Sequence, residues 1–207
     1  NLTPQQAIND GARWRRVGAS TWQNSGATIT NIAAGNHEIE FKSVTGWIDN
    51  ENLPIVVSPN QLTEHNVEYQ RAQYMLELLY AEHGSVQADP SNQNSMYDYG
   101  TAVTLTPLPD DYYEFDYWSG DVPSGSETNN PLVVTITGLT TIQPHFKPLI
   151  GTIKVDILPQ GAIDAGAKWR RVGASTWRDS GSTITGIPAG DHQVEFKPTS
   201  GWKTPAK

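Results

Sequence analysis

The sequence of 207 residues contains no cysteine, which excludes a disulfide framework and every metal site built on thiolates. No stretch approaches the roughly 18 consecutive apolar residues of a membrane-spanning helix, so we expect no membrane insertion. Basic residues are few, with 14 Lys and Arg against 22 Asp and Glu, and the net charge is −8. This surplus of negative charge argues against nucleic acid as a partner.

Charge of either sign is sparse. Charged residues make up 17% of the chain, below the roughly 25% that is usual for globular domains. The 18 Gly, 14 Pro, 7 Trp and 8 Tyr are typical of short strands joined by turns. This is an ordinary composition for a secreted β-protein, so we expect an extracellular or cell-surface location. Because the sequence opens without Met, we expect a mature or excised piece.

One long stretch of the sequence occurs twice. Residues 11–47 read GARWRRVGASTWQNSGATITNIAAGNHEIEFKSVTGW, and residues 166–202 repeat them at a constant offset of 155 without a gap. Extended outward, the match pairs residues 1–52 with 156–207, and 29 of these 52 positions are identical. Self-similarity at a fixed period indicates a repeated structural unit. We therefore expect three small modules, whose predicted ranges are 1–71, 72–147 and 148–207.

Alternation of apolar and polar residues between turn signals predicts short antiparallel strands. The strands predicted in the first copy cover residues 12–17, 28–32, 37–41, 54–57 and 65–69. The predicted core residues of this copy are Ile29, Ile32, Ile39, Phe41 and Trp47. Trp14 and Arg16 would share a face, so either a bulge intervenes or the Arg16 stem packs inward while its head reaches the rim near Glu40. We favour the second interpretation.

The middle block also alternates Val, Ile and Thr between Gly and Pro. Residues 71–82 depart from this pattern because their Ala, Gln, Met, Leu and Glu have the propensity of a helix. The expected fold class is nevertheless all-β, with three small antiparallel modules in tandem.

The middle block resembles the divergent internalin-type B repeat of bacterial surface proteins. The resemblance lies in YDYGTAVTLTPLP at residues 97–109, YEFDYWSGD at 113–121 and NPLVVTI at 130–136. It implies a β-grasp-like module whose first segment is a strand, so we expect residues 74–80 to be a strand despite their helix propensity. The family usually carries Gly at the positions of Tyr112 and Tyr117.

The two flanking copies are similar to the PEGA-like β-sandwich modules of bacterial secreted and surface proteins. The shared motif is GA-W-R, then W-SG-T-I, then G-H-EF-GW. Such a module opens with a strand and closes with two strands after the GW. The first copy begins within its opening strand, whereas the second has its opening strand at 153–157 and stops before its closing pair. Both families are known as spacers, stalks and adhesive modules, which implies a protein that is not an enzyme.

Acidic residues gather in the middle block and could supply oxygen ligands for calcium. The candidates are Asp110, Asp111, Asp116 and Asp121. Because no D-x-D-x-D-G spacing is present, we interpret them as a solvated acidic face and expect no cofactor, with calcium as the alternative. His37 and His192 occupy equivalent positions and suggest a turn or packing role. No HExxH or G-x-S-x-G motif supports catalysis.

Four aromatic residues are predicted to be exposed. Trp22 and Trp177 follow polar turns in the two copies, and Tyr112 and Tyr117 stand where the resemblance implies Gly. Exposed aromatic rings can stack on sugars or anchor a protein partner. The plainer interpretation is that they cover small cores.

We expect a non-enzymatic, extracellular structural or adhesive module that serves as a stalk, adhesin segment or fibre subunit. Unpaired strand edges at both ends would invite strand addition, and a head-to-tail contact that does not close would build a filament. The expected partners are further copies or neighbouring modules, with a cell-surface protein or glycan as the alternative. A piece of a longer array is the plain alternative to assembly, and a glycan-binding module using the four aromatics is the alternative function.

Overall fold

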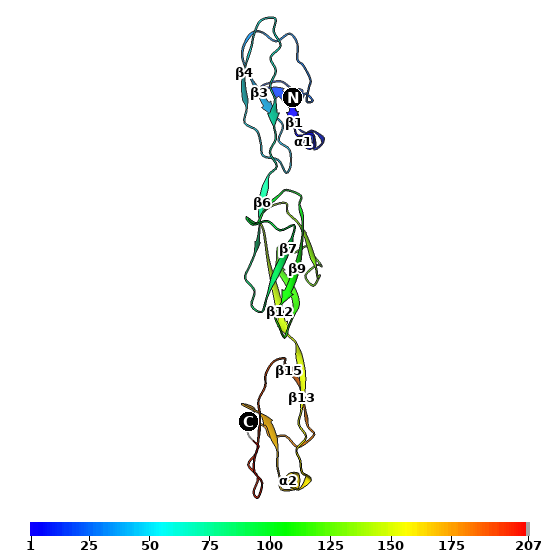
Figure 1. The fold of residues 1–207 in the computed structure, drawn as a ribbon. Helices are drawn as coiled ribbons and strands as arrows, with labels where there is room; N and C mark the ends of the chain where they lie inside the picture. The colour runs from blue at the N-terminus through cyan, green and yellow to red at the C-terminus, as the bar shows by residue number, and fades with distance from the viewer. Residues whose placement is uncertain (206–207) are drawn as a thin grey trace.

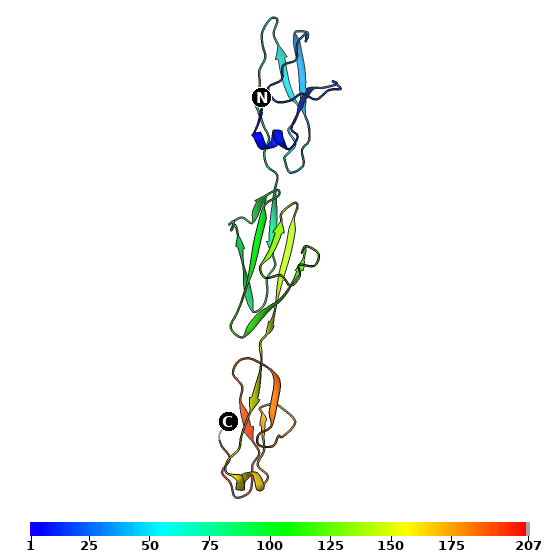
Figure 2. The ribbon, with the colours of Figure 1, turned by 90° about the vertical axis from the view of Figure 1, so that its right-hand side faces the viewer.

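A computed structural model describes residues 1–205 and shows three β modules arranged end to end along one axis (Figures 1 and 2). The first two modules have separate hydrophobic cores. The molecule is therefore an elongated rod, and the all-β tandem architecture is confirmed.

The N-terminal module consists of two small sheets and one short helix. Its elements are β1 (Leu2–Thr3), α1 (Gln5–Asn9), β2 (Trp14–Arg16), β3 (Gly35–Phe41), β4 (Leu53–Val57) and β5 (Val67–Glu68). Strands β2, β3 and β4 form an antiparallel sheet, and β1 pairs in parallel with β5. The buried core residues are Leu2, Ala7, Ala12, Val44, Trp47 and Tyr69.

The core predicted for this module is only partly correct. Trp47 is buried with 8% exposure, and Phe41 packs against the core. Ile29, Ile32 and Ile39 are half-buried instead, because they line an open groove. The strand predicted at 28–32 is absent, since no neighbouring strand pairs with it.

The predicted partner of Glu40 is also wrong by one residue. The Arg15 Nε atom lies 2.8 Å from the Glu40 Oε1 atom, whereas Arg16 lines the groove together with Trp14. Arg15 and Glu40 are cross-strand neighbours in the β2–β3 ladder, which places their side chains on the same face of the sheet.

The middle module is built from two sheets that enclose one core. Its strands are β6 (Gln73–Leu78), β7 (Gly84–Asp89), β8 (Met96–Asp98), β9 (Ala102–Pro109), β10 (Tyr113–Gly120), β11 (Leu132–Thr135) and β12 (Thr140–Pro148). One sheet has the order β10-β12-β6-β8 and the other β11-β9-β7. All pairs are antiparallel except β12 with β6.

The segment with helix propensity is a strand, as the resemblance implied. Along β6, Tyr74, Leu76 and Leu78 face the core of the middle module. Trp118, from β10, is 1% exposed in the same core. Burial at every second residue therefore outweighs local helix propensity here.

The C-terminal module repeats the first with fewer strands. Its elements are β13 (Ile150–Lys154), α2 (Gln160–Asp164), β14 (Trp169–Arg171), β15 (Thr183–Pro188) and β16 (Val194–Phe196). Strand β13 pairs with β15, and β14 pairs with β16. The opening strand predicted at 153–157 lies three residues earlier at each end. The helices α1 and α2 were not predicted, and each buries one alanine, Ala7 or Ala162.

Candidate functional site

Backbone hydrogen bonds hold the joint between the N-terminal and middle modules. The Ile48 N–H donates to the Gln70 carbonyl at 2.8 Å, and the Ala72 N–H donates to the Gly46 carbonyl at 3.0 Å. On the other side, the Tyr99 N–H donates to the Ala72 carbonyl at 2.8 Å. Ala72 is thus bonded to both modules, so the joint is a short β-bridge rather than a flexible linker.

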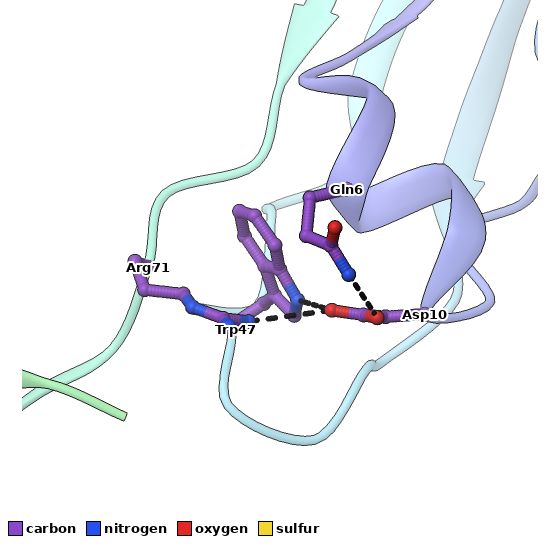
Figure 3. A network of polar contacts seen from close by, with 4 residues as sticks. All are labelled: Gln6, Asp10, Trp47 and Arg71. Carbon is purple, nitrogen blue, oxygen red and sulfur yellow. Dashed lines mark hydrogen bonds and ion pairs between the residues drawn. The ribbon is translucent and has the colours of Figure 1, made fainter. Parts of the chain in front are cut away.

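Asp10, at the end of α1, anchors this joint through a polar network (Figure 3). Its Oδ2 atom accepts a hydrogen bond from Trp47 Nε1 at 3.0 Å and lies 3.3 Å from the Arg71 guanidinium. Its Oδ1 atom accepts a hydrogen bond from Gln6 Nε2 at 2.8 Å. The Arg71 guanidinium also covers the Trp47 ring, 4.6 Å from the ring centroid.

These contacts change the acidity of Asp10. The Trp47 hydrogen bond has the largest effect, and together with the Gln6 hydrogen bond and the positive charge of Arg71 it holds the pKa of Asp10 below its ordinary value of 3.8. Partial burial acts in the opposite direction but does not prevail. The carboxylate is therefore ionised at neutral pH and ties α1 to the connecting segment.

Gly46 allows the two modules to come close together. Its φ of +81° lies in the left-handed region, and a Cβ atom at this position would overlap the Tyr99 ring of the middle module. Tyr99 in turn packs edge-on against Tyr74, with 6.3 Å between ring centroids. Only glycine satisfies both the backbone conformation and the close contact.

The joint between the middle and C-terminal modules is a single residue. Strand β12 ends at Pro148 and β13 begins at Ile150, with only Leu149 between them. The Leu149 N–H donates to the Tyr112 carbonyl of the middle module at 2.8 Å, and its carbonyl accepts a hydrogen bond from the Ala189 N–H of the C-terminal module at 2.6 Å. Both backbone groups of the linker are therefore used, one by each module.

Tyr112 and Tyr117 are exposed, by 57% and 41% respectively. Tyr112 has a φ of +69°, a left-handed conformation that glycine adopts more readily than tyrosine. Tyr117 stacks on the His145 ring across the β10–β12 pair, with centroids 4.2 Å apart. One face of the Tyr117 ring is thus already occupied.

Trp22 and Trp177 are half-buried rather than exposed, which corrects the prediction. The Arg15 guanidinium lies 4.1 Å from the Trp22 ring centroid while its Nε atom pairs with Glu40. The second copy repeats this arrangement with Arg170 stacked on Trp177 at 4.2 Å and paired with Glu195 at 2.7 Å. We call each set a Trp–Arg–Glu stack: Trp22, Arg15 and Glu40 in the first copy, and Trp177, Arg170 and Glu195 in the second.

The structure does not bring the four predicted aromatics together. Trp22 lies between β2 and β3 of the N-terminal module and Trp177 between β14 and β15 of the C-terminal one. In the middle module Tyr112 directly precedes β10 and Tyr117 lies within it. No common binding surface joins the residues of the three modules. Glycan binding through them stays a prediction.

The acidic candidates are likewise dispersed. Asp110 and Asp111 lie in the turn between β9 and β10, whereas Asp121 accepts a hydrogen bond from the Thr141 N–H at 2.9 Å. Asp116 lies 3.1 Å from Lys147 Nζ, and this hydrogen bond is the main cause that raises the pKa of Lys147 above its ordinary value. Within residues 1–205, no group of three or more Asp, Glu or His side chains is placed to hold a metal ion.

The repeated histidines both contact a backbone carbonyl four residues earlier. The His37 Nε2 atom lies 2.8 Å from the Ala33 carbonyl, and the His192 Nε2 atom lies 2.6 Å from the Pro188 carbonyl. These equivalent contacts agree with the predicted turn role.

Sequence reasoning missed a hydrogen-bonded serine and histidine in the middle module. The Ser119 Oγ atom lies 2.7 Å from His145 Nε2 on neighbouring strands. Nucleophilic catalysis also needs a group that orients the histidine. No carboxylate in the described part of the chain pairs with the His145 ring, so we interpret this pair as a cross-strand contact.

The middle module matches a known family of repeats. Residues 74–149 match the family model described as the divergent InlB B-repeat domain. The middle block resembles a bacterial surface-protein repeat. This family is a repeat domain of surface proteins and not an enzyme family. The similarity of the flanking copies to PEGA-like modules stays a prediction.

No curated protein matches the sequence. Among solved structures, the chain is similar to one described as the Bacillus anthracis TIE protein, with a TM-score of 0.55 and 10% sequence identity. The similarity covers 95% of this chain and 44% of that one, so the chain spans less than half of its length. At this identity the likeness concerns the fold alone. Neither short helix within residues 1–205 has the length or apolar character to cross a membrane.

Proposed function

We propose that the chain is a structural stalk segment of an extracellular bacterial surface protein, in which the three modules set a fixed distance. The observation that carries this proposal is the single-residue linker. Leu149 donates its N–H to the Tyr112 carbonyl and its own carbonyl accepts a hydrogen bond from the Ala189 N–H, so each neighbouring module fixes one of the two peptide units that flank this residue. Rotation between the modules would break at least one of these bonds.

The other joint supports the same role. Ala72 bonds to Gly46 and Tyr99, and the Asp10 network holds Arg71, which precedes Ala72. Net hydrogen-bond energies of about 1 kcal/mol are modest one at a time. Several of them within a few residues, together with the Gly46–Tyr99 contact, restrict bending of the joint. The resemblance of the middle module to a surface-protein repeat agrees with a spacer function.

Spin-label distances test whether the rod is rigid. Because the chain has no cysteine, labels can be attached at Val133→Cys and Leu158→Cys, which lie on either side of the Leu149 joint and are 53% and 85% exposed. We expect one narrow distance distribution. A Gly-Ser insertion between Pro148 and Leu149 should broaden it.

The matched control is the same Gly-Ser insertion after Gly125, in an exposed loop of the middle module. It should leave the distance distribution narrow. A broad distribution in the chain without insertions would refute the stalk proposal, because it would show that the modules already move independently.

A further inference from the structure

An apolar groove runs along the N-terminal module. Its volume is about 440 Å³, and it lies between the sheet β2-β3-β4 and two segments without strands, residues 26–34 and 58–66. Its apolar lining includes Ile29, Ile32, Ile39, Phe41, Leu53, Ile55, Val57 and Leu62. Several of these are the residues that the sequence predicts to be core. The groove is therefore the unfilled part of a sandwich interior.

The backbone beside this groove has free hydrogen-bonding groups. Residues 28–33 form no backbone–backbone hydrogen bond with any other residue of the described range 1–205. Their equivalents in the second copy, Thr183–Pro188, form strand β15. The same sequence pattern is thus paired in one copy and unpaired in the other. An unpaired edge beside an apolar surface is suited to the addition of a strand.

The second copy shows which strand occupies the corresponding place. There β13 pairs antiparallel with β15, so that Ile153 lies opposite Ile184 and Thr152 opposite Thr185. The Gly181 N–H also donates to the Val155 carbonyl at 2.9 Å. With this strand in place, Ile187 is 5% exposed, whereas its equivalent Ile32 is only half-buried.

The two copies have the same geometry up to the point where this strand would end. The Ile157 N–H donates to Ser180 Oγ at 2.8 Å, and the equivalent Leu2 N–H donates to Ser25 Oγ at the same distance. Residues Ile150–Val155 of the second copy therefore correspond to a segment that would end directly beside Asn1.

A second neighbour for the strand is present only in the N-terminal module. Strands β1 and β5 pair in parallel, with Leu2 opposite Val67, and the Asn1 amino group donates to the His65 carbonyl. Continued beyond Asn1, this ladder runs into the groove along residues 61–66. A strand there would lie between two partners and would be a central strand of the second sheet.

We propose that the groove is an acceptor for one extended strand of the Ile150–Val155 type, whose last residue lies beside Asn1. It would run antiparallel to residues 28–32, with its Ile153 equivalent opposite Ile29. Asn31, with a φ of +58°, already has the left-handed conformation of its equivalent Gly186, at +69°, where the β13–β15 ladder has its bulge. The acceptor is therefore formed in advance.

The occupant is defined by its alternation. In β13 and the residues after it, Ile153 and Val155 are half-buried while Thr152 and Lys154 are exposed. An acceptable strand thus has two apolar side chains at alternate positions facing the groove and polar side chains facing water. This inference goes beyond the stalk proposal and does not depend on it, since a rigid rod is possible with the groove either open or filled.

The test joins the seven residues Leu149–Val155 directly ahead of Asn1 in the full chain. Because a joined strand has an effective concentration in the millimolar range, it should occupy the groove even if its intrinsic affinity is low. We expect hydrogen exchange at the amides of residues 28–33 to slow by about tenfold or more. Amides of the middle-module core, such as Val103 and Leu105, serve as the internal reference and should not change.

The matched control carries the same extension with Asp at the positions of Ile153 and Val155. It should leave exchange at residues 28–33 within about twofold of the original chain, because a carboxylate placed against the isoleucine side chains of the groove would lose its hydration. Equal protection by both extensions, or protection by neither, overturns the proposal. Concentration-dependent dimerisation of the original chain that protects residues 28–33 would also overturn it, by assigning the groove to a second copy.

Discussion

The two copies of the repeat bury different tryptophans of the same sequence pattern. In the N-terminal copy Trp47 is 8% exposed, whereas its equivalent Trp202 in the C-terminal copy is 42% exposed. For the equivalent pair Trp14 and Trp169, the C-terminal residue is the more buried one. Trp14 is half-buried, whereas Trp169 is 0% exposed. The same residue types in the same pattern therefore have different burial within one chain.

Neighbouring strands account for this difference. The N-terminal copy continues after its GW, and Val67 of β5 and Tyr69 pack in the same core as Trp47. The C-terminal copy has β13, which pairs with β15 and places Gly151 opposite the buried Ile187. Pairing also sets strand length, since β3 spans seven residues beside β4 and its equivalent β16 only three. Burial here depends on non-local partners more than on local sequence.

The largest expected effect comes from removing the fully buried tryptophan. Trp169→Ala should destabilise the C-terminal module by about 3–5 kcal/mol, the usual cost of truncating a buried aromatic residue. Trp14→Ala, at the equivalent but half-buried position, should cost about half as much. Hydrogen exchange with mass spectrometry, followed module by module through a urea series, measures both.

Each variant also provides the control for the other, because effects at distant independent sites are additive within about 0.3–0.5 kcal/mol. Trp169→Ala should not change exchange in residues 1–71, and Trp14→Ala should not change it in the C-terminal module. Equal losses of unfolding free energy for the two substitutions would mean that the difference in burial between Trp14 and Trp169 does not affect stability.

The glycine of the repeated GW motif gives the next largest effect. Gly201→Ala should cost about 1–2 kcal/mol, because its φ of +78° strains any residue with a Cβ although the surrounding space is open. Gly46→Ala should cost about 2–4 kcal/mol, since the added methyl group must also displace the Tyr99 ring. Denaturant midpoints of the individual modules measure the difference. A cost at Gly46 no larger than that at Gly201 would remove the close contact from the description of the joint.

The sequence was sufficient to predict the repeat, the all-β class and the strand character of β6. The repeat follows from self-similarity at a constant offset and the all-β class from alternation, whereas the strand character of β6 follows only from the resemblance of the middle block to the internalin-type B repeat. The sequence was not sufficient for Ile32, which is half-buried, whereas its equivalent Ile187 is 5% exposed where Gly151 of β13 lies opposite it. Helices α1 and α2 have five residues each, too few for helix propensity to accumulate into a signal.

The contacts at the joints between modules could not be predicted from the sequence either. Asp10 and Arg71 are 61 residues apart in sequence, and Tyr99 lies still farther along the chain. No spacing or motif predicts such contacts. The sequence correctly predicted that Trp14 and Arg16 share a face, but Glu40 lies across the ladder from Arg15, so the predicted Arg16–Glu40 contact is not formed.

Acidification should lower the stability of the N-terminal module more than that of the C-terminal module. We expect this effect to be smaller than that of the glycine substitutions. The pKa of Asp10 is lower in the folded chain than its ordinary value of 3.8, mainly because of the Trp47 hydrogen bond. A depressed folded-state pKa gives stabilisation that is complete above the unfolded value and is lost as the pH falls through the folded value. The N-terminal module should therefore lose stability below about pH 4.

The C-terminal copy has Ala165 and Gly161 where the first has Asp10 and Gln6. The stability of the C-terminal module should therefore lack the acid dependence that Asp10 gives to the N-terminal module. Asp10→Asn should remove the contribution from the first module while keeping a similar shape. Thermal unfolding between pH 3 and pH 6, with each module followed separately, measures the change. An unaltered acid dependence in Asp10→Asn would show that other carboxylates cause it.

The smallest effect concerns a feature that the two copies share, the Trp–Arg–Glu stack. Arg15→Lys and Arg170→Lys keep the positive charge but lose the planar group that covers Trp22 or Trp177 and pairs with the glutamate. Each should cost about 0.5–1 kcal/mol, as expected for a partly exposed cation–π contact. The two losses should agree within about 0.5 kcal/mol, because both stacks lie on the outer face of a paired strand in each copy. Chemical denaturation of the two variants measures them. A clear difference between the two losses would mean that β4, β5 or β13 also affects the face that carries the Trp–Arg–Glu stack. The two copies would then differ on this face as well as on the sides where those strands lie.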